Sequence, residues 1–298
     1  MSGRITDGMT ARLVLSDIQS VAERMSRSQE RMSSGKQLTR PSDDPFATSR
    51  ALMYREELAA NVQYQRNAED ASSWQSVTDT ALGQIGDLVQ RARELVVRGA
   101  NDTLDATGRA AIAGELDQIT EAMKGIGNTQ YAGRYVFSGS ATQTEPYATG
   151  GADGYAGNGD LIEREIGRGV RIAVNVTGDT VLGDGSSGLI GAMRTAAANL
   201  RVGGDMNALR TTDLRAITTA QDALSTTRAA VGARANRLDA AADRLSQMEG
   251  AATQLLSNTE DADFAETLID YSMQSSAYQA ALKSGANLIQ PSLMDFLR

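Results

Sequence analysis

VLSDIQSVAERMSRSQERM, residues 14–32, is a heptad repeat. Its apolar side chains recur at alternating steps of four and three residues, the pattern of a helix that packs along a seam against a second helix. Ser28 interrupts this seam, and Gly35 follows as a natural end to the helix. The apolar seam residues are Val14, Ile18, Val21, Met25 and Met32.

A second seam lies near the other end of the chain, in a predicted helix over about residues 261–289. Ser275 and Gly285 leave gaps in it, so this seam is weaker than a continuous apolar stripe. Two such seams predict that the N- and C-terminal helices pair with each other. The seam positions are Leu268, Tyr271, Ser275, Tyr278, Leu282, Gly285 and Ile289, and Phe296 lies one heptad beyond.

The predicted pair of terminal helices is marginal on its own. Two helices bury little surface against the entropy that is lost when their backbones become ordered. We therefore expect these helices to be mobile in the monomer and to become ordered when neighbouring subunits bury them.

A turn-rich connector follows the first helix over residues 33–48, SSGKQLTRPSDDPFAT. Hydroxyl and acidic side chains just before a proline favour the start of a helix, because they accept hydrogen bonds from its unpaired N–H groups. Asp43 with Asp44, or Asp261 with Asp263, could alternatively be catalytic or calcium-binding carboxylates. Such sites need several oxygens that converge on one point, so helix capping is the preferred interpretation. The connector and capping residues are Pro41, Ser42, Asp43, Asp44 and Pro45.

The middle of the sequence predicts helices around a glycine-rich insertion. A helix is expected over residues 45–99, and a second one, capped by Asp105 or Thr107, carries an apolar stripe over residues 112–126. The glycine-rich loop at residues 150–160 lacks the lysine pattern of a phosphate-binding loop and is interpreted as a surface loop. Short β-type runs cover residues 134–137, 161–166 and 170–176.

Helices return after Leu189 and complete the predicted fold. One stripe that repeats every seven residues, with mixed companions, suits a helix inside a bundle. Its members are Ile217, Leu224, Val231, Leu238, Leu245 and Ala252. The predicted fold is mainly α, with the terminal helices paired in a coiled coil or helical bundle and a small inserted β-rich domain. The predicted domains are a terminal coiled-coil domain (1–40 with 256–298), a helical bundle domain (41–130 with 190–255) and an inserted β-rich outer domain (131–189).

Composition argues against several classes of function. The net charge is −8 without a basic block, so binding to nucleic acid is not expected. No apolar run approaches the roughly 20 residues that span a bilayer, and residues 1–10 lack the apolar stretch of a cleaved secretory signal. The chain has no His and no Cys, the commonest general base and frequent metal ligands, so neither an enzyme nor a bound cofactor or metal is expected. Hydrolysis by a pair of carboxylates is the remaining enzymatic alternative.

Short motifs at both ends of the chain resemble the flagellin superfamily. They are residues 4–6 (RIT), 33–36 (SSGK), 40–45 (RPSDDP), 64–67 (YQRN), 128–129 (NT), 133–139 (GRYVFSG), 261–263 (DAD) and 292–297 (SLMDFL). Each motif alone is moderately specific, whereas their order and their placement at both ends are highly specific. Pro41, Pro45, the YVFSG block at 135–139 and the MDFL ending resemble the hook–filament junction subunits of this superfamily more than its filament subunits.

The resemblance implies a structural function, a location and a set of partners. Members are exported unfolded through the flagellar type III channel, and their terminal helices form the inner tube of the assembly. The implied location is outside the cell, in the bacterial flagellum at the hook–filament junction. The implied partners are other copies of the chain in a ring, the first hook-associated protein, flagellin, and an export chaperone at the C-terminal helix. The alternatives are a flagellin filament subunit and, more remotely, a coiled-coil tether or effector of another type III system.

Overall fold

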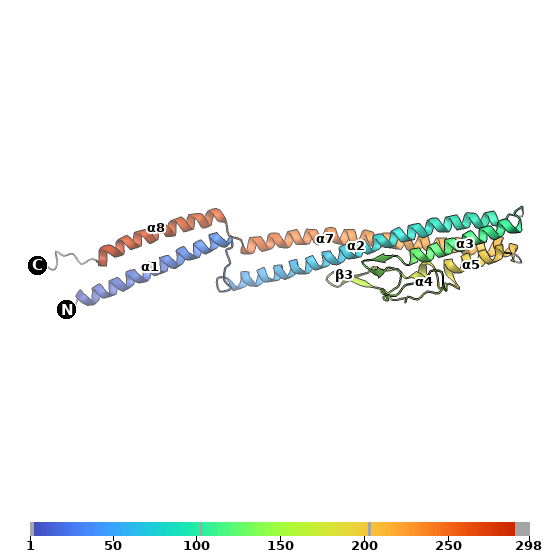
Figure 1. Cartoon of the computed structure of the whole chain (residues 1–298). Coiled ribbons are helices and arrows are strands. Elements are labelled where there is room, and N and C mark those ends of the chain that lie inside the picture. The colour runs from blue at the N-terminus through green and yellow to red at the C-terminus, as the bar shows by residue number, and fades with distance from the viewer. Residues whose placement is uncertain (1–2, 102, 202–203, 290–298) are drawn as a thin grey trace. The chain divides into compact units, whose positions relative to one another are not determined.

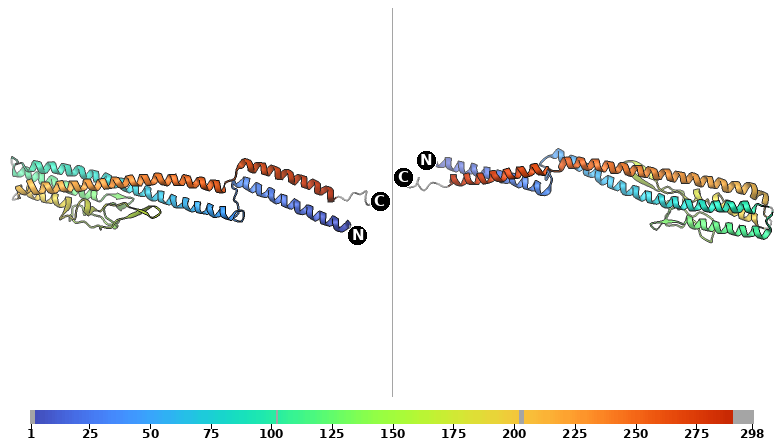
Figure 2. Two further views of the ribbon diagram at one scale, coloured as in Figure 1. Left: turned by 180° about the vertical axis from the view of Figure 1, so that it is seen from behind. Right: turned by 90° about the horizontal axis from the view of Figure 1, so that it is seen from above.

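A computed structural model describes residues 3–101, 103–201 and 204–289 of the 298. Contacts divide the chain into two compact units, the terminal unit (residues 1–60 with 249–298) and the central unit (residues 61–248). Helices dominate and the described strands form two small sheets, so the predicted mainly α fold is confirmed (Figures 1 and 2). The elements are α1 (Gly3–Ser34), α2 (Pro45–Gly99), α3 (Ala106–Gly127), β1 (Gln130–Tyr131), β2 (Arg134–Tyr135), β3 (Glu163–Gly167), β4 (Val170–Ala173), α4 (Gly178–Val181), α5 (Gly188–Leu200), α6 (Met206–Ala208), a π-helical turn (Leu209–Asp213), α7 (Leu214–Glu260) and α8 (Phe264–Ile289).

In the central unit α2 and α7 run side by side (Figure 1). An ion pair of 2.9 Å between Arg228 Nε on α7 and Asp79 Oδ1 on α2 joins them at the surface. The stripe predicted along α7 is buried over its whole length, which confirms that this helix packs inside a bundle. The stripe residues, each at most 4% exposed, are Ile217, Leu224, Val231, Leu238, Leu245 and Ala252.

The helices α3 and α5 pack against each other and complete the core of the central unit. Asp105 caps α3, because its carboxylate accepts a 2.9 Å hydrogen bond from the N–H of Gly108. This contact decides between the two predicted caps, Asp105 and Thr107. Trp74, the single tryptophan of the chain, is 2% exposed in this core and meets Tyr131 edge to face at 5.8 Å. Trp74 fluorescence therefore reports on the central unit alone.

The strands are shorter than predicted, because each sheet has only two strands and a strand ends where its partner begins. β2 ends at Tyr135, which pairs with Gln130, the first residue of β1. β4 ends at Ala173, which pairs with Glu163, the first residue of β3. The residues that follow these two ends are buried, namely Val136, Phe137, Val174, Asn175 and Val176.

The β3–β4 hairpin docks on α2 and α7 where those helices carry small side chains. Ala68 and Ala71 on α2 and Ala241 on α7 leave room for the apolar side chains of the hairpin. Amides of α2 satisfy its backbone: Asn67 Nδ2 donates to the carbonyl of Glu165 at 2.8 Å. The apolar partners in this cluster are Ile166, Ile172, Val174 and Leu238.

A buried ion network joins α3, α5 and the glycine-rich loop. The side chain of Lys124 is fully buried, and its Nζ lies 3.1 Å from Asp153 Oδ1 and 3.3 Å from Glu121. Arg194 on α5 donates to the same two carboxylates, at 2.8 Å to Asp153 and 2.6 Å to Glu121, and to Asp117 at 2.8 Å. Nothing in the sequence predicts this network, because lysine is almost always exposed and the partner Asp153 lies far from Lys124 in the sequence.

The network predicts how the central unit responds to acid. The hydrogen bond from Arg194 lowers the pKa of the Asp153 carboxyl. Burial by itself raises the pKa of the Glu121 carboxyl, but hydrogen bonds from the Gly150 N–H, Arg194 and Lys124 lower it by more. The pKa of Glu121 therefore lies below its ordinary value. A carboxyl whose pKa is lower in the folded chain than in the unfolded chain stabilises the fold at pH values above its unfolded pKa. That stabilisation is lost as the pH falls through its folded pKa.

We therefore expect the melting temperature of the central unit to stay level between about pH 5 and 8 and to fall below about pH 4. The chain has no histidine to titrate in the neutral range. Thermal melts followed by Trp74 fluorescence at a series of pH values measure this. A loss of stability that begins above pH 6 would contradict the assignment.

Candidate assembly surface

The terminal unit contains the predicted pair of terminal helices. α1 and α8 lie side by side in every view and run antiparallel (Figures 1 and 2). An antiparallel backbone β-bridge between Lys36 and Asp261 closes the pair at one end. A 3.4 Å hydrogen bond from Arg24 Nε to Gln274 Oε1 lies midway along the pair. Pairing of the terminal helices is thus confirmed.

Large side chains of α1 face small side chains of α8. A Cβ atom added at Gly285 would lie 3.2 Å from both Ile18 Cδ1 and Val14 Cγ1, so the missing side chain lets the two helices approach closely. The α1 side of this contact consists of the predicted seam. Val14, Ile18, Val21, Met25 and Met32 are all half-buried.

On α8 the face turned inward departs from the predicted seam at two positions, while Ser275 is half-buried and Gly285 is buried as the seam predicts. Tyr271 and Tyr278 are half-buried, whereas Leu268 and Leu282 are 47% and 44% exposed. Thr267 is buried, at the position before Leu268, and Ala281 is half-buried before Leu282. The helix is rotated so that smaller residues accept the bulky side chains of α1. The side chain of Ile289, the last residue of α8, and all of Phe296 lie outside the described residues.

Gly285 gives a direct test of this packing. Gly285→Leu should destabilise the α1–α8 pair by about 1–3 kcal/mol, because the new side chain has no space between Val14 and Ile18. Amide hydrogen exchange of α1 in the full chain measures the change. Ala286→Leu is the matched control, since Ala286 is exposed. Equal exchange rates in the two variants would contradict the close contact.

The connector residues build the start of α2. Asp44 accepts a 2.9 Å hydrogen bond from the N–H of Ala47 and caps the helix. Asp43 closes the preceding turn instead, where its Oδ2 accepts from the N–H of Arg40 at 3.0 Å and from Thr39 Oγ1 at 3.2 Å. Pro41, Ser42 and Pro45 lie exposed in this segment.

The turn between α7 and α8 is built in the same way. Asp263 accepts hydrogen bonds from the N–H groups of Ala265 at 2.8 Å and Glu266 at 3.2 Å, and so caps α8. Asp261 instead forms the backbone β-bridge with Lys36. Within the described residues, no group of three or more acidic side chains is placed to hold a metal ion.

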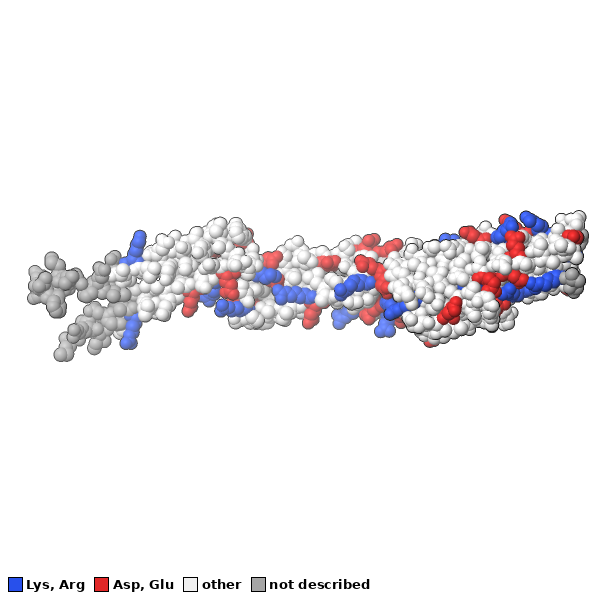
Figure 3. Space-filling model, viewed as in Figure 1, with Lys and Arg blue, Asp and Glu red and all other residues white. Residues whose placement is uncertain are grey.

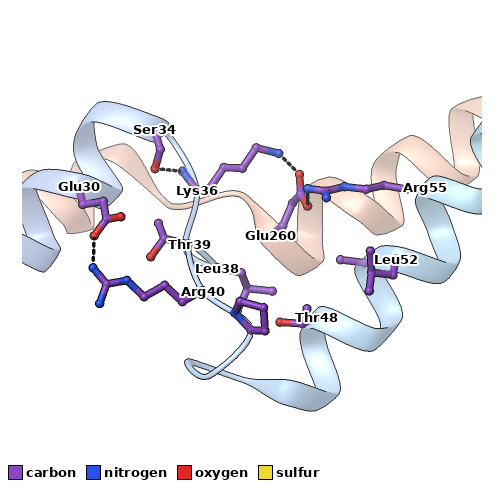
Figure 4. Close-up of a pocket in the computed structure, with 12 residues that line it drawn as sticks. Glu30, Ser34, Lys36, Leu38, Thr39, Arg40, Thr48, Leu52, Arg55 and Glu260 are labelled. Carbon is purple, nitrogen blue, oxygen red and sulfur yellow. Dashed lines mark hydrogen bonds and ion pairs between the residues drawn. The ribbon is translucent and has the colours of Figure 1, made fainter.

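Glu260 joins the connector between α1 and α2 to the turn between α7 and α8, and we call this contact the joint (Figure 4). The carboxylate of Glu260 is 4% exposed, and it pairs with Lys36 of the connector and with Arg55 NH2 of α2 at 2.5 Å. Its carbonyl accepts a 2.7 Å hydrogen bond from the N–H of Gln37, and the carbonyl of Gly35 accepts one of 2.9 Å from Ala262. A buried carboxylate needs such partners, and those of Glu260 join the connector to α2 within the terminal unit.

An open cavity of about 490 Å³ lies beside this joint (Figure 4). Apolar side chains from the connector and α2 form much of its wall, and charged side chains surround them. We call it the joint cavity. Its lining residues are Glu30, Ser34, Lys36, Leu38, Thr39, Arg40, Pro41, Thr48, Ala51, Leu52, Arg55 and Glu260.

The terminal unit exposes most of the large apolar side chains that the described surface carries. α8 has three charged residues among 26, and Figure 3 shows few charged side chains over it. Ile269 and Met273 lie on the face opposite Thr267 and Tyr271, so α8 is apolar on more than one side. The exposed set is Met9, Leu13, Leu15, Phe46, Leu52, Met53, Leu255, Phe264, Leu268, Ile269, Met273 and Leu282.

The terminal unit also lacks a hydrophobic core of its own in its described part. Both clusters of buried apolar residues lie within the central unit. The buried apolar side chains of the terminal unit are alanines, namely Ala47, Ala51 and Ala252. Exposed apolar surface of this kind is typical of sites where proteins interact.

Two protein-family models match the chain, one in its N-terminal part and one in its C-terminal part. Residues 5–142 match the model of the bacterial flagellin N-terminal helical region, and residues 214–297 match that of the flagellin C-terminal helical region. The chain belongs to the flagellin family. The segment between the matched regions holds β3, β4 and α5, so Asp153 and Arg194 of the ion network lie outside the parts that the flagellin models match.

Two similar proteins within the flagellin family are named hook-associated, and others are named flagellin. The chain is 28% identical over 277 residues to flagellar hook-associated protein 3 of Escherichia coli K12, covering 86% of this chain and 87% of that protein. It is 28% identical over 295 residues to the protein of the same name from Salmonella typhimurium LT2, with 90% and 92% covered. The flagellar junction protein FlgL of Legionella pneumophila has a similar fold, with a TM-score of 0.58 at 15% identity over 71% of this chain and all of that one.

Among the described residues of this flagellin-family chain, no helix is both long and apolar enough to cross a bilayer.

Proposed function

We propose that this chain is a structural subunit of the bacterial flagellum that joins the hook to the filament. One observation carries the proposal: the terminal unit has no apolar core among its described residues and exposes large apolar side chains on several faces of α8. Such a unit gains its stability when other subunits cover it. The similarity to two hook-associated proteins 3 over most of their length supports the junction in particular.

The partners follow from this position in the flagellum. Copies of the chain form a ring through the exposed apolar side chains of α1 and α8, with the first hook-associated protein on one side and flagellin on the other. The chain is exported to reach this place, and an export chaperone covers the C-terminal helix beforehand. The function is geometric, with neither catalysis nor a cofactor. The exposed, weakly charged α8 is the surface that supports these assignments.

Deletion of the gene tests the proposed function. Electron microscopy of the deletion strain should show hooks without filaments, and flagellin should appear in the medium because export continues without a junction. Complementation with the gene should restore filaments. Filaments that persist on the hooks would refute the proposal. Bare hooks without any filament protein in the medium would identify the chain as the filament subunit instead.

We also propose that α1 and α8 remain dynamic in the isolated chain, since their contact is made of half-buried side chains. Limited proteolysis of the purified chain should cut the terminal unit at low protease concentration and leave the central unit intact. Protection of α1 and α8 is expected after assembly into flagella. Equal resistance of the two units in the isolated chain would contradict this proposal.

A further inference from the structure

Two exposed phenylalanines stand at the joint of the terminal unit. The chain has four phenylalanines, and one of them, Phe137, is 1% exposed in the core. Phe46 and Phe264, in contrast, are 85% and 64% exposed, each directly at the start of a helix. Exposed aromatic side chains of this kind are the usual anchors of protein interfaces, because each buries a large area at a small entropy cost.

The joint cavity offers a site of matching character. Leu38, Pro41, Ala51 and Leu52 give it an apolar wall, and neither exposed phenylalanine is among its lining residues. Its volume of about 490 Å³ leaves room for a phenyl ring. Leu52 is itself 54% exposed, so the apolar wall is open to an incoming side chain.

Charge at the rim selects between the two phenylalanines. The rim cations Lys36, Arg40 and Arg55 have side chains that are 41%, 65% and 52% exposed, whereas the carboxylate of Glu260 that balances two of them is 4% exposed. Glu30, 43% exposed and 3.5 Å from Arg40, is the one exposed carboxylate among the lining residues, so cations outnumber anions on the surface that a partner meets. This surface favours an aromatic residue with a carboxylate beside it that is not engaged in a turn or a cap.

Phe264 satisfies this condition better than Phe46. The segment 261–266 reads DADFAE: Asp263 before Phe264 caps α8, whereas Glu266 in the first turn of α8 is exposed and takes no part in the cap as an acceptor. The carboxylates that precede Phe46, those of Asp43 and Asp44, are already engaged in the turn and the cap of α2.

We infer that Phe264 of one copy inserts into the joint cavity of a second copy, with Glu266 beside the rim arginines. The inference rests on the proposed function, and it assigns a specific contact to the ring. Knob and cavity are different surfaces of the same joint, so the contact is heterologous and each copy offers one of each to its neighbours. Repetition of such a contact produces a closed ring or a helical tube rather than a dimer.

Cross-linking between engineered cysteines tests the contact without background, because the chain has no cysteine. A disulfide forms only when the two Cβ atoms come within about 4.5 Å. The double variant Phe264→Cys with Leu52→Cys, expressed in the deletion strain, should give a ladder of dimers, trimers and larger species when isolated flagella are oxidised. Each single variant should give no ladder. Both side chains are exposed, and Trp74 fluorescence verifies that each variant is folded.

Two further variants separate the outcomes. Phe46→Cys with Leu52→Cys is the matched control, and a ladder from this pair alone would overturn the inference in favour of Phe46. Glu266→Arg added to the first pair should weaken the ladder, and Arg40→Glu on the same chain should restore it. Absence of a Phe264–Leu52 ladder from chains that are incorporated into flagella would refute the contact and leave the junction function intact. Oxidation of the purified full chain at high concentration gives the same readout should the variant fail to be incorporated.

Discussion

A proline at Val21 or at Leu282 should abolish filament attachment while the central unit stays folded. Proline removes a helical hydrogen bond and clashes with the preceding turn, which costs about 3 kcal/mol or more in a helix interior. Val21 lies in the middle of α1, and Leu282 lies in the last third of α8. The pair of helices has no apolar core that could absorb this cost, so we expect non-motile cells with bare hooks.

Leu282 separates the backbone effect from the loss of a side chain. Its side chain is 44% exposed, and Leu282→Ala should therefore leave the helix intact and weaken only contacts to other subunits. Electron microscopy and swimming assays compare the variants in the deletion strain. The melting transition seen by Trp74 should be the same in all of them, because Trp74 lies in the central unit. Motile cells with normal filaments that carry either proline variant would refute the role assigned to the paired helices.

Loss of the Asp153 carboxylate should strongly destabilise the central unit. Asp153→Ala leaves the buried ammonium of Lys124 with Glu121 as its remaining carboxylate, and Arg194 loses its two hydrogen bonds to Asp153. Removing one member of a buried ion pair typically costs 3–5 kcal/mol, and the second carboxylate keeps the expected value near about 3 kcal/mol. The Trp74 melting temperature should fall by about 6–12 °C.

A double variant serves as the control for this prediction. Lys124→Met with Asp153→Ala replaces the ammonium by an apolar group of similar length, and it should recover most of the lost stability because no unpaired charge remains inside. Filament attachment should survive in the double variant, since the network lies outside the terminal unit. An unchanged melting temperature in Asp153→Ala would show that the network contributes little to the fold.

Local patterns in the sequence were enough to predict the long helices, and they limited the cap of α3 to Asp105 or Thr107. The heptad of Val14 to Met32 lies in α1, the seven-residue stripe of α7 is buried, and Asp105 caps α3. These features depend on neighbours within a few residues, because the helical period and the unpaired N–H groups at a helix start are local properties. The pairing of the terminal helices followed from two seams of matching period.

The candidate site was predicted less completely, because contacts between distant segments determine it. Leu268 and Leu282 belong to the apolar pattern of α8, yet they are exposed, since the bulky seam of α1 needs the small Thr267, Ala281 and Gly285. A helix that is apolar on several sides has no single stripe from which its orientation could be derived.

What the sequence determined by itself is the helical plan, the capped connector and the segment that holds the short strands. Only the tertiary structure decided that Lys124 is buried, that the strands end early, and that Glu260 ties the connector to α2 beside an open cavity. The physical reason is that helix formation depends on side chains that are near one another in the sequence. A buried charge, or a contact such as that of Glu260, instead requires partners from distant parts of the sequence to meet at one point.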